Sequence, residues 1–310
     1  MKNYKNLLDS ETWEFVEKTK SFLGSLTGTQ TVKEQRDNFN KLWKAFTSDY
    51  PEGLKIYNNI IDEVPIRVYT NEKNCNNNAE VIYFHGGGFV VGSLESHDSI
   101  CADICFHTGL TIVAVDYSLA PENTYPKPLD DCLTCLKWMD ANNDKPIILC
   151  GDSAGGWLAS SLTHAVRYKN FNIIGQLLIY PLLGADINQG SYLSNANSPT
   201  ITREDIIFYY KAFFGENIKV DLRDGPLLDH DFTNLPPTII FSAEFDPLFD
   251  DGKEYEKLLK QNGIKVKFFE EKGLIHGYLR ARNSVNIAKN SFKNICIGLR
   301  NLSKNKWPYK

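Results

Sequence analysis

The chain has 310 residues, of which 42 % are hydrophobic and 23 % charged, so it can bury a sizeable core in one or two domains. The formal net charge is −4 and no basic patch is present, which argues against a nucleic-acid partner. No window approaches the ~18 apolar residues that a membrane-spanning helix needs, and the N-terminus lacks the apolar region of a secretory signal. We therefore expect a cytoplasmic protein.

The cysteines are odd in number and scattered, and most of the seven lie in apolar surroundings. This pattern is typical of reduced, buried thiols rather than of a disulfide framework. Cys132 and Cys135 have the spacing of a redox or zinc pair, but no second cysteine or histidine pair stands at zinc-ligand spacing. We interpret them, together with Cys101 and Cys105, as core thiols.

The N-terminal part of the chain predicts helices followed by a strand pair. Two helical patterns fall within residues 12–47. Two alternating stretches follow, at residues 54–60 and 64–69, and they predict antiparallel strands joined at Asp62-Glu63.

From residue 81 onward, short apolar runs alternate with helical patterns. Further strands are expected at residues 81–85, 111–117, 146–150, 176–180, 237–243 and 266–271. The last helix is the clearest, because its apolar residues recur at spacings of three and four from Val285 to Leu302. Apolar strands separated by helices predict an α/β fold, with a mostly parallel sheet of about eight strands and helices on both faces.

One segment, residues 185–232, interrupts this alternation between two predicted sheet strands. It contains a predicted helix at 203–214, which begins after Thr202 and has acidic residues in its first turn. We interpret residues 185–232 as a cap folded over one end of the sheet. The helices of residues 1–50 are expected to contribute to the cap, and residues 51–184 and 233–310 form the core.

Residues 151–155 read Gly-Asp-Ser-Ala-Gly and fit the pattern G-x-S-x-G where a predicted strand gives way to a helix. A glycine-rich turn that lets a helix pack closely on a sheet would explain the glycines alone. A nucleophile elbow would also explain Ser153, with Asp152 beside it supporting the local backbone. A serine nucleophile needs a base within hydrogen-bond reach, and the base needs an acid that orients it.

On this architecture the partners follow the serine in the order acid, then histidine. Of the six histidines, His276 follows the last predicted strand, where a loop could bring it over the serine. The others lie too early in the chain or within the cap: His85, His97, His107, His164 and His230. Position and order therefore make His276 the expected base.

The acid is expected just past the strand at 237–243. Four carboxylates compete there: Glu244, Asp246, Asp250 and Asp251. We favour Asp246, because Pro247 ends the loop and suits the first turn of a helix. Asp250 and Asp251 are then expected to be exposed helix carboxylates.

The run HGGGF, which begins at His85, follows a predicted strand and predicts an oxyanion hole. Glycines let backbone N–H groups face a ligand without side-chain obstruction, and each such donor is worth roughly 3 kcal/mol of barrier. We assign the hole to the N–H groups of Gly87, Gly88 and Ala154. His85 and Gly86 are expected to support the loop.

Together these motifs resemble the hormone-sensitive-lipase-like, or GDXG, branch of the α/β-hydrolases. The resemblance rests on HGGGF, DYSLAPE at residues 116–122, GDSAGG, DPL and the HG at His276, and it runs from about residue 55 to the C-terminus. HGGGFVVGSLESHD and AEFDPLFDD are especially similar to bacterial acetyl esterases of that branch.

The resemblance implies an α/β-hydrolase fold with a helical cap and the catalytic triad Ser153, Asp246 and His276. It also implies a serine esterase that acts on short-chain carboxylic esters through an acyl-enzyme, without a metal or organic cofactor. The aromatic residues of the cap helix are expected to pack the cap, while one or two line an acyl pocket: Phe208, Tyr209, Tyr210, Phe213 and Phe214.

Two alternatives stay open at this point. The same triad could cleave an amide or formamide, and the fold could serve as a ligand receptor or regulatory binding protein. Plant gibberellin receptors of this branch lack the catalytic histidine, so His276 argues against a receptor. The expected partner is a small-molecule ester, with no nucleic acid and no membrane span, and a homodimer is compatible with the sequence.

Overall fold

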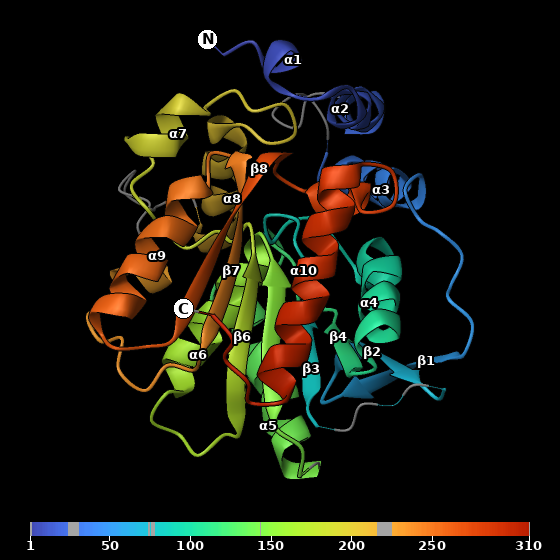
Figure 1. Ribbon diagram of the computed structural model, residues 1–310, viewed down its shortest axis with the longest axis vertical. Helices are drawn as coiled ribbons and strands as arrows, with labels where there is room; N and C mark the ends of the chain where they lie inside the picture. Colours follow the sequence, from blue (N-terminus) through green and yellow to red (C-terminus); the bar gives the residue numbers. More distant parts are fainter. Residues whose placement is uncertain are drawn as a thin grey trace.

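Figure 1 shows the computed structural model, which describes residues 2–23, 31–73, 75, 78–142, 144–215 and 225–309. A sheet of eight strands runs through the molecule, with helices on both of its faces. This confirms the predicted α/β fold, a sheet of about eight strands with helices on both faces.

The strand order across the sheet is β1-β2-β4-β3-β5-β6-β7-β8. Their bounds are β1 Leu54–Ile61, β2 Val64–Asn71, β3 Glu80–Phe84, β4 Thr111–Val115, β5 Ile147–Asp152, β6 Ile173–Ile179, β7 Thr238–Phe245 and β8 Val266–Ile275. The pairs β1–β2 and β2–β4 are antiparallel, and all other neighbours in the sheet are parallel.

Side chains of the central strands alternate between two buried clusters, because successive residues of a strand point to opposite faces. In β3, Ile82 and Phe84 pack into one cluster, whereas Val81 and Tyr83 pack into the other. The first cluster receives residues of α5 Lys127–Asn142, α6 Ala154–Val166 and α9 Phe249–Gln261. The second receives residues of α4 Leu94–Thr108 and α10 Asn286–Ser303, and α10 lies in front of the strands in Figure 1.

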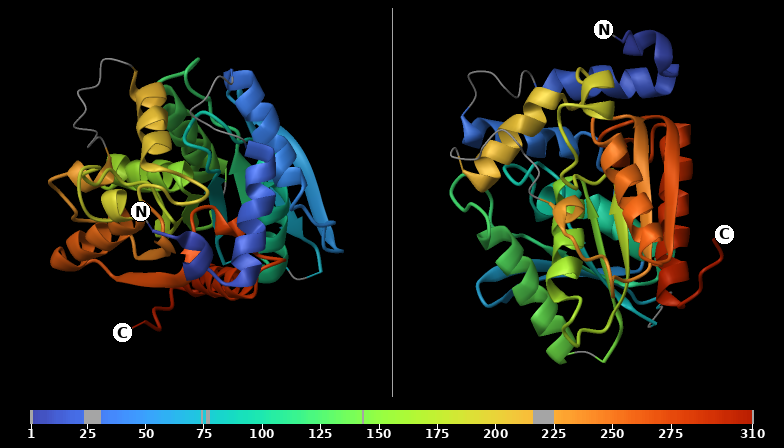
Figure 2. Two further views of the ribbon diagram at one scale, coloured as in Figure 1. Left: turned by 90° about the horizontal axis from the view of Figure 1, so that it is seen from above. Right: turned by 90° about the vertical axis from the view of Figure 1, so that its left-hand side faces the viewer.

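The remaining helices gather at the end of the sheet where the parallel strands terminate (Figures 1 and 2). They are α1 Tyr4–Leu7, α2 Ser10–Leu23, α3 Val32–Lys44, α7 Gly190–Ser194 and α8 Arg203–Phe214, and short 3-10 turns follow at η1 Pro226–Leu228 and η2 Tyr278–Ala281. Parts of the predicted cap, residues 24–30 and 216–224, lie outside the described residues. The division into cap and core stays a prediction.

Helix α8 has the bounds that the sequence predicts, and its start shows why. The Thr202 hydroxyl accepts a hydrogen bond from the Asp205 N–H at 3.1 Å, and the Asp205 carboxylate accepts one from the Thr202 N–H at 2.8 Å. This reciprocal pair is a capping box, which satisfies donors that a helix start otherwise leaves unpaired.

The cysteines form no disulfide bonds. All seven cysteines are free; six are buried and Cys75 is exposed. Within the described ranges, no helix combines the length and the apolar character needed to cross a bilayer.

The parallel strands deliver the predicted site residues to one edge. The residues at the ends of β7 and β8, Phe245 and Ile275, are paired with each other, so the segments that follow these strands start side by side. Phe84 of β3 likewise lies opposite Gly151 of β5. Because ligands of open parallel sheets bind beyond the carboxyl ends of the strands, this edge is the place to look for a site.

Candidate active site

Ser153 occupies a sharp turn between β5 and α6. Its backbone has φ 55° and ψ −118°, a conformation that a residue with a side chain adopts only when its surroundings enforce it. The Ser153 N–H donates to Ile179 O at 2.9 Å, and its carbonyl accepts from Leu182 N at 3.1 Å. A Cβ on Gly155 would collide with the carbonyl of Phe84, so the small neighbour lets the helix approach the sheet.

The structure brings together the three side chains predicted as a triad. His276 Nε2 lies 2.9 Å from Ser153 Oγ, and His276 Nδ1 lies 2.7 Å from Asp246 Oδ2. Asp246 is fully buried, and its other oxygen accepts the Leu248 N–H at 2.8 Å. With the proton on Nδ1, the imidazole can accept the proton of the serine hydroxyl.

The other carboxylates considered for the acid bind backbone N–H groups instead. Glu244 accepts from Gly273 N at 2.8 Å, and Asp250 accepts from Ser191 N at 2.7 Å. The expectation that Asp251 is an exposed helix carboxylate is wrong, because it is fully buried.

Asp251 is buried because the first turn of α9 packs against the chain that leaves β6. One of its oxygens accepts the N–H groups of Leu183 at 2.6 Å and Gly184 at 3.0 Å. Burial is the main cause that raises the pKa of Asp251 to about 7, although these donors oppose the shift. The carboxylate thus organises a turn and does not reach His276.

The glycines of the HGGGF run form one wall beside the serine. Gly87 and Gly88 have φ values of 127° and 59°, and both line the same cavity as Ser153 and His276. A Cβ on Gly88 would collide with the Tyr209 ring, so only glycine fits there. Their backbone can therefore approach a bound group closely.

Ala154 lies directly after the serine and is the first residue of α6. The first N–H groups of a helix have no partner within the helix, and they carry its positive dipole end. Ala154 is buried in the core and is not among the residues that line the cavity, so its role as an oxyanion donor stays a prediction.

Asp152, beside the serine, links the glycine-rich loop at residues 86–88 to the turn at Ser153 through hydrogen bonds. Its carboxylate accepts from Tyr83 OH at 2.8 Å, Gly86 N at 3.0 Å and Tyr180 OH at 3.3 Å. His97 Nε2 also lies 3.3 Å away, without the alignment of a hydrogen bond. Burial would raise the pKa of Asp152, but His97 and the hydrogen bonds outweigh it and lower the pKa below its ordinary value.

His85 supports the start of the glycine-rich loop at residues 86–88. Its Nδ1 lies 2.9 Å from Gly86 O, and its ring stacks on Tyr117 with ring centres 4.3 Å apart. Burial, followed by the neighbouring His97, lowers the pKa of His85 to about 3, so its ring is neutral at physiological pH. His85 is not among the residues that line the cavity.

The cavity beside Ser153 is small, about 50 Å³. Tyr209 of α8 and Trp43 of α3 form part of its lining, so both the N-terminal helices and residues 185–232 reach the site. A larger surface cleft of about 810 Å³ lies between residues 184–192 and α9, but it shares no lining residue with this cavity. We take the small cavity as the candidate site because it contains Ser153 and His276.

Comparison with known proteins places this site in a family. A family model described as alpha/beta hydrolase fold matches residues 81–280. The chain is 34% identical over 233 residues to the carboxylesterase NlhH of Mycobacterium tuberculosis, covering 71% of this chain and 72% of that protein. The chain belongs to the hormone-sensitive-lipase-like esterases. It is also 31% identical over 278 residues to an acetyl esterase of Salmonella paratyphi B, covering 84% of each.

The fold of this esterase is correspondingly similar to solved structures. The hyperthermophilic esterase from the archaeon Pyrobaculum calidifontis matches with a TM-score of 0.85 and 26% identity, covering 96% of this chain and 99% of that one. The family resemblance inferred from the motifs is confirmed, and the chain is a carboxylic ester hydrolase. In its described part, the esterase has no group of three or more His, Cys, Asp or Glu side chains that could hold a metal ion.

Sequence reasoning missed several residues of the site. Tyr180, Trp43 and Arg280 line the cavity of the esterase, yet none belongs to a motif. Arg280 alone carried a local signal, because it follows the HG motif at His276 closely in the sequence.

Proposed function

We propose that this esterase hydrolyses short-chain carboxylic esters by serine catalysis through an acyl-enzyme intermediate. The observation that carries the proposal is the continuous hydrogen-bond chain from Asp246 through His276 to Ser153, at 2.7 and 2.9 Å, beside a glycine-lined cavity. Nucleophile, base and orienting acid are thus all within hydrogen-bond reach before a substrate arrives.

In the acylation step, Ser153 Oγ attacks the ester carbonyl carbon while His276 Nε2 takes the hydroxyl proton. Asp246 keeps the imidazole in the productive tautomer and stabilises its positive charge. The oxygen that becomes negative faces the N–H groups of Gly87, Gly88 and Ala154. Collapse of this intermediate breaks the bond to the leaving alcohol, which receives the proton from His276.

In the second step, water replaces the alcohol. His276 takes a proton from the water as its oxygen attacks the acyl carbon on Ser153. The second tetrahedral intermediate collapses, the carboxylic acid leaves, and the serine oxygen regains its proton from His276. The cycle consumes one ester and one water and yields one alcohol and one acid.

The preference for short acyl groups rests on the size of the cavity. A cavity of about 50 Å³, closed by Tyr209 and Ile201, is far smaller than the ~300–1,000 Å³ pockets that hold drug-sized ligands. In this proposal, residues 1–50 and 185–232 act as the cap that limits the acyl chain.

The experiment compares wild-type esterase with Ser153→Ala, using p-nitrophenyl acetate. Loss of the nucleophile should lower kcat by at least about 10⁴-fold. Ser161→Ala, on the same helix α6, is the matched control and should retain turnover. Thermal unfolding checks that both variants are folded. Substantial turnover by folded Ser153→Ala would rule out serine catalysis at this position.

A further inference from the structure

Arg280 is a buried cation in the candidate active site. It belongs to η2, is 5 % exposed, and lines the same cavity as Ser153 and His276. Its Nη2 lies 2.8 Å from the position that a Cβ on Gly277 would occupy, so glycine makes room for the guanidinium. The side chain is therefore packed at the site and does not reach into solvent.

Aromatic rings from the N-terminal helices hold this guanidinium. Its central carbon lies 5.6 Å from the ring centre of Phe15 in α2 and 5.3 Å from that of Trp43 in α3. Both distances fit cation–π contacts, which attract a cation without neutralising it. The rings fix the position of the charge and leave its hydrogen-bond donors available.

The carboxylates nearest to the site are already engaged by other groups. Asp246 binds His276 and a backbone N–H, and Asp152 binds two tyrosines and Gly86. Arg280 Nε has no hydrogen-bond partner, and among the residues described here no carboxylate forms an ion pair with Arg280. The positive charge thus has no carboxylate in direct contact, and Asp152 acts on it only through space.

Arg282, on the same segment, shows how this chain normally buries an arginine. Its Nε lies 2.7 Å from Asp103 Oδ2, and its Nη2 donates to Ser99 Oγ at 2.9 Å. A buried charge is costly unless it is paired and hydrogen-bonded. Burial lowers the pKa of Arg280 to about 10, which still leaves it charged at neutral pH.

We propose that Arg280 binds an anionic group of the substrate, so that the esters preferred by this site are short esters that carry a carboxylate. A guanidinium matches a carboxylate in shape and can donate two parallel hydrogen bonds to it. The substrate would supply the directly paired carboxylate that the protein does not. This inference rests on the proposed function, because it concerns the ester bound beside Ser153.

The test uses pairs of esters of equal shape, in which a carboxylate replaces an isopropyl group. Monomethyl succinate and methyl 4-methylpentanoate place the difference on the acyl side. Acetoxyacetate and isobutyl acetate place it on the alcohol side. For each pair, kcat/KM is measured by titration of released acid, and the ratio of the anionic to the neutral ester is the readout.

In wild-type enzyme we expect this ratio to exceed one by about ten- to hundredfold for one of the two pairs, which identifies the side of the ester that faces Arg280. Arg280→Met and Arg280→Gln should each reduce that ratio at least tenfold, whereas Arg280→Lys should restore part of it. A ratio below one for both pairs, or a ratio that the folded uncharged variants leave unchanged, would overturn the inference.

A binding measurement separates this inference from the proposed function. Ser153→Ala protein, titrated calorimetrically with monomethyl succinate and acetoxyacetate, should bind one of them, and adding Arg280→Lys or Arg280→Gln should weaken that binding. If wild type hydrolyses p-nitrophenyl acetate but prefers neutral esters, the inference fails and the proposed function stands. If binding depends on Arg280 but no ester is hydrolysed, the proposed function fails and the anion site stands. Absence of binding to both anions contradicts the inference.

Discussion

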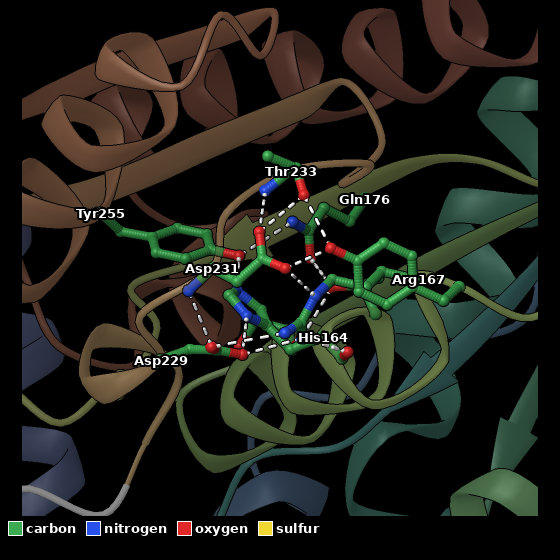
Figure 3. A network of polar contacts seen from close by, with 10 residues as sticks. His164, Arg167, Gln176, Asp229, Asp231, Thr233 and Tyr255 are labelled. Carbon is green, nitrogen blue, oxygen red and sulfur yellow. Dashed lines mark hydrogen bonds and ion pairs between the residues drawn. The ribbon is translucent and has the colours of Figure 1, made fainter.

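Among the residues that the structure describes, two chains of hydrogen bonds join a carboxylate, an imidazole and a hydroxyl. We call Asp246–His276–Ser153 the serine relay and Asp229–His164–Tyr255 the tyrosine relay. In the tyrosine relay, the histidine lies 2.9 Å from the carboxylate and 3.0 Å from the phenol oxygen (Figure 3). The corresponding distances in the serine relay are 2.7 and 2.9 Å. Hydrogen-bond lengths alone therefore do not distinguish them.

The surroundings of the two relays do distinguish them. Tyr255 is fully buried, and its hydroxyl also receives a hydrogen bond from Gln176 at 3.2 Å. Asp229 is paired with Arg167 at 2.8 Å (Figure 3). His164 and Asp229 line a surface pocket of about 450 Å³, but the hydroxyl-bearing Tyr255 is not among its lining residues. Ser153 instead lies on a strained turn and faces a cavity. A relay is fit for catalysis when its last hydroxyl has space for a reacting atom and donors beside it.

The largest expected effect comes from removing each histidine in turn. His276→Ala should lower kcat/KM for p-nitrophenyl acetate by about 10⁴-fold, because the general base is lost. His164→Ala should keep most of the activity but lose about 2 kcal/mol of unfolding free energy, because Asp229 and Tyr255 lose their partner. Steady-state kinetics measure the activity of each variant, and urea unfolding measures its stability. Similar activity losses in the two variants would erase the distinction between the relays.

The glycine wall of the serine relay should give the next largest effect. Gly88→Ala introduces a side chain at φ 59° against the Tyr209 ring, and should lower kcat about 10²-fold by displacing an oxyanion donor. Gly263→Ala is the matched control, because Gly263 has φ 74° but open space around it. The control should lose stability only. Equal kcat values for Gly88→Ala and wild type would remove Gly88 from the oxyanion hole.

The pH dependence of stability tests the support beneath the serine relay. The folded pKa of His85 is about 3, below its ordinary value near 6.5, so between these values the unfolded state binds more protons. The contribution of neutral, buried His85 to the free energy of unfolding is fully present above pH 6.5. It falls by about 1.4 kcal/mol per pH unit as the pH is lowered toward 3. His85→Gln should remove this slope. Urea unfolding at pH 7, 6 and 5 measures it, and parallel curves for both proteins would contradict the buried, neutral histidine.

The smallest effect concerns the acyl chain. Across p-nitrophenyl esters from acetate to decanoate, kcat/KM should be highest for acyl groups of about two to six carbons and fall about tenfold or more for the longest. Tyr209→Ala should move the optimum toward longer chains, because the Tyr209 ring bounds the cavity. A steady rise toward decanoate in the wild-type enzyme would refute the role given to cavity size.

The serine relay could be predicted from sequence because the fold dictates where its members lie. Parallel strands end at one edge, so Ser153, Asp246 and His276 could be assigned from their order and from the strands they follow. Helix α8 could be placed because Thr202 and Asp205 form its cap through local contacts. Such features depend on short stretches of chain or on topology.

Other features depend on which side chains of distant elements meet. Asp251 is buried because α9 packs against residues 183–185, and nothing in its own stretch of sequence distinguishes it from an exposed helix carboxylate. Arg280 and Arg282 read alike in the sequence, yet Asp103 of α4 reaches only Arg282. Whether a buried charge has a partner is a property of packing, and sequence patterns do not encode it locally.

Covalent labelling with a small dialkyl fluorophosphonate tests the serine relay most directly. Such a reagent reacts with a serine that an adjacent base activates, and intact-mass measurement with peptide mapping locates the adduct. We expect one adduct per chain, on Ser153, and its loss in folded His276→Ala protein, while His164→Ala is labelled like the wild type. An unlabelled Ser153 in wild-type protein, or labelling that persists without His276, would contradict the account.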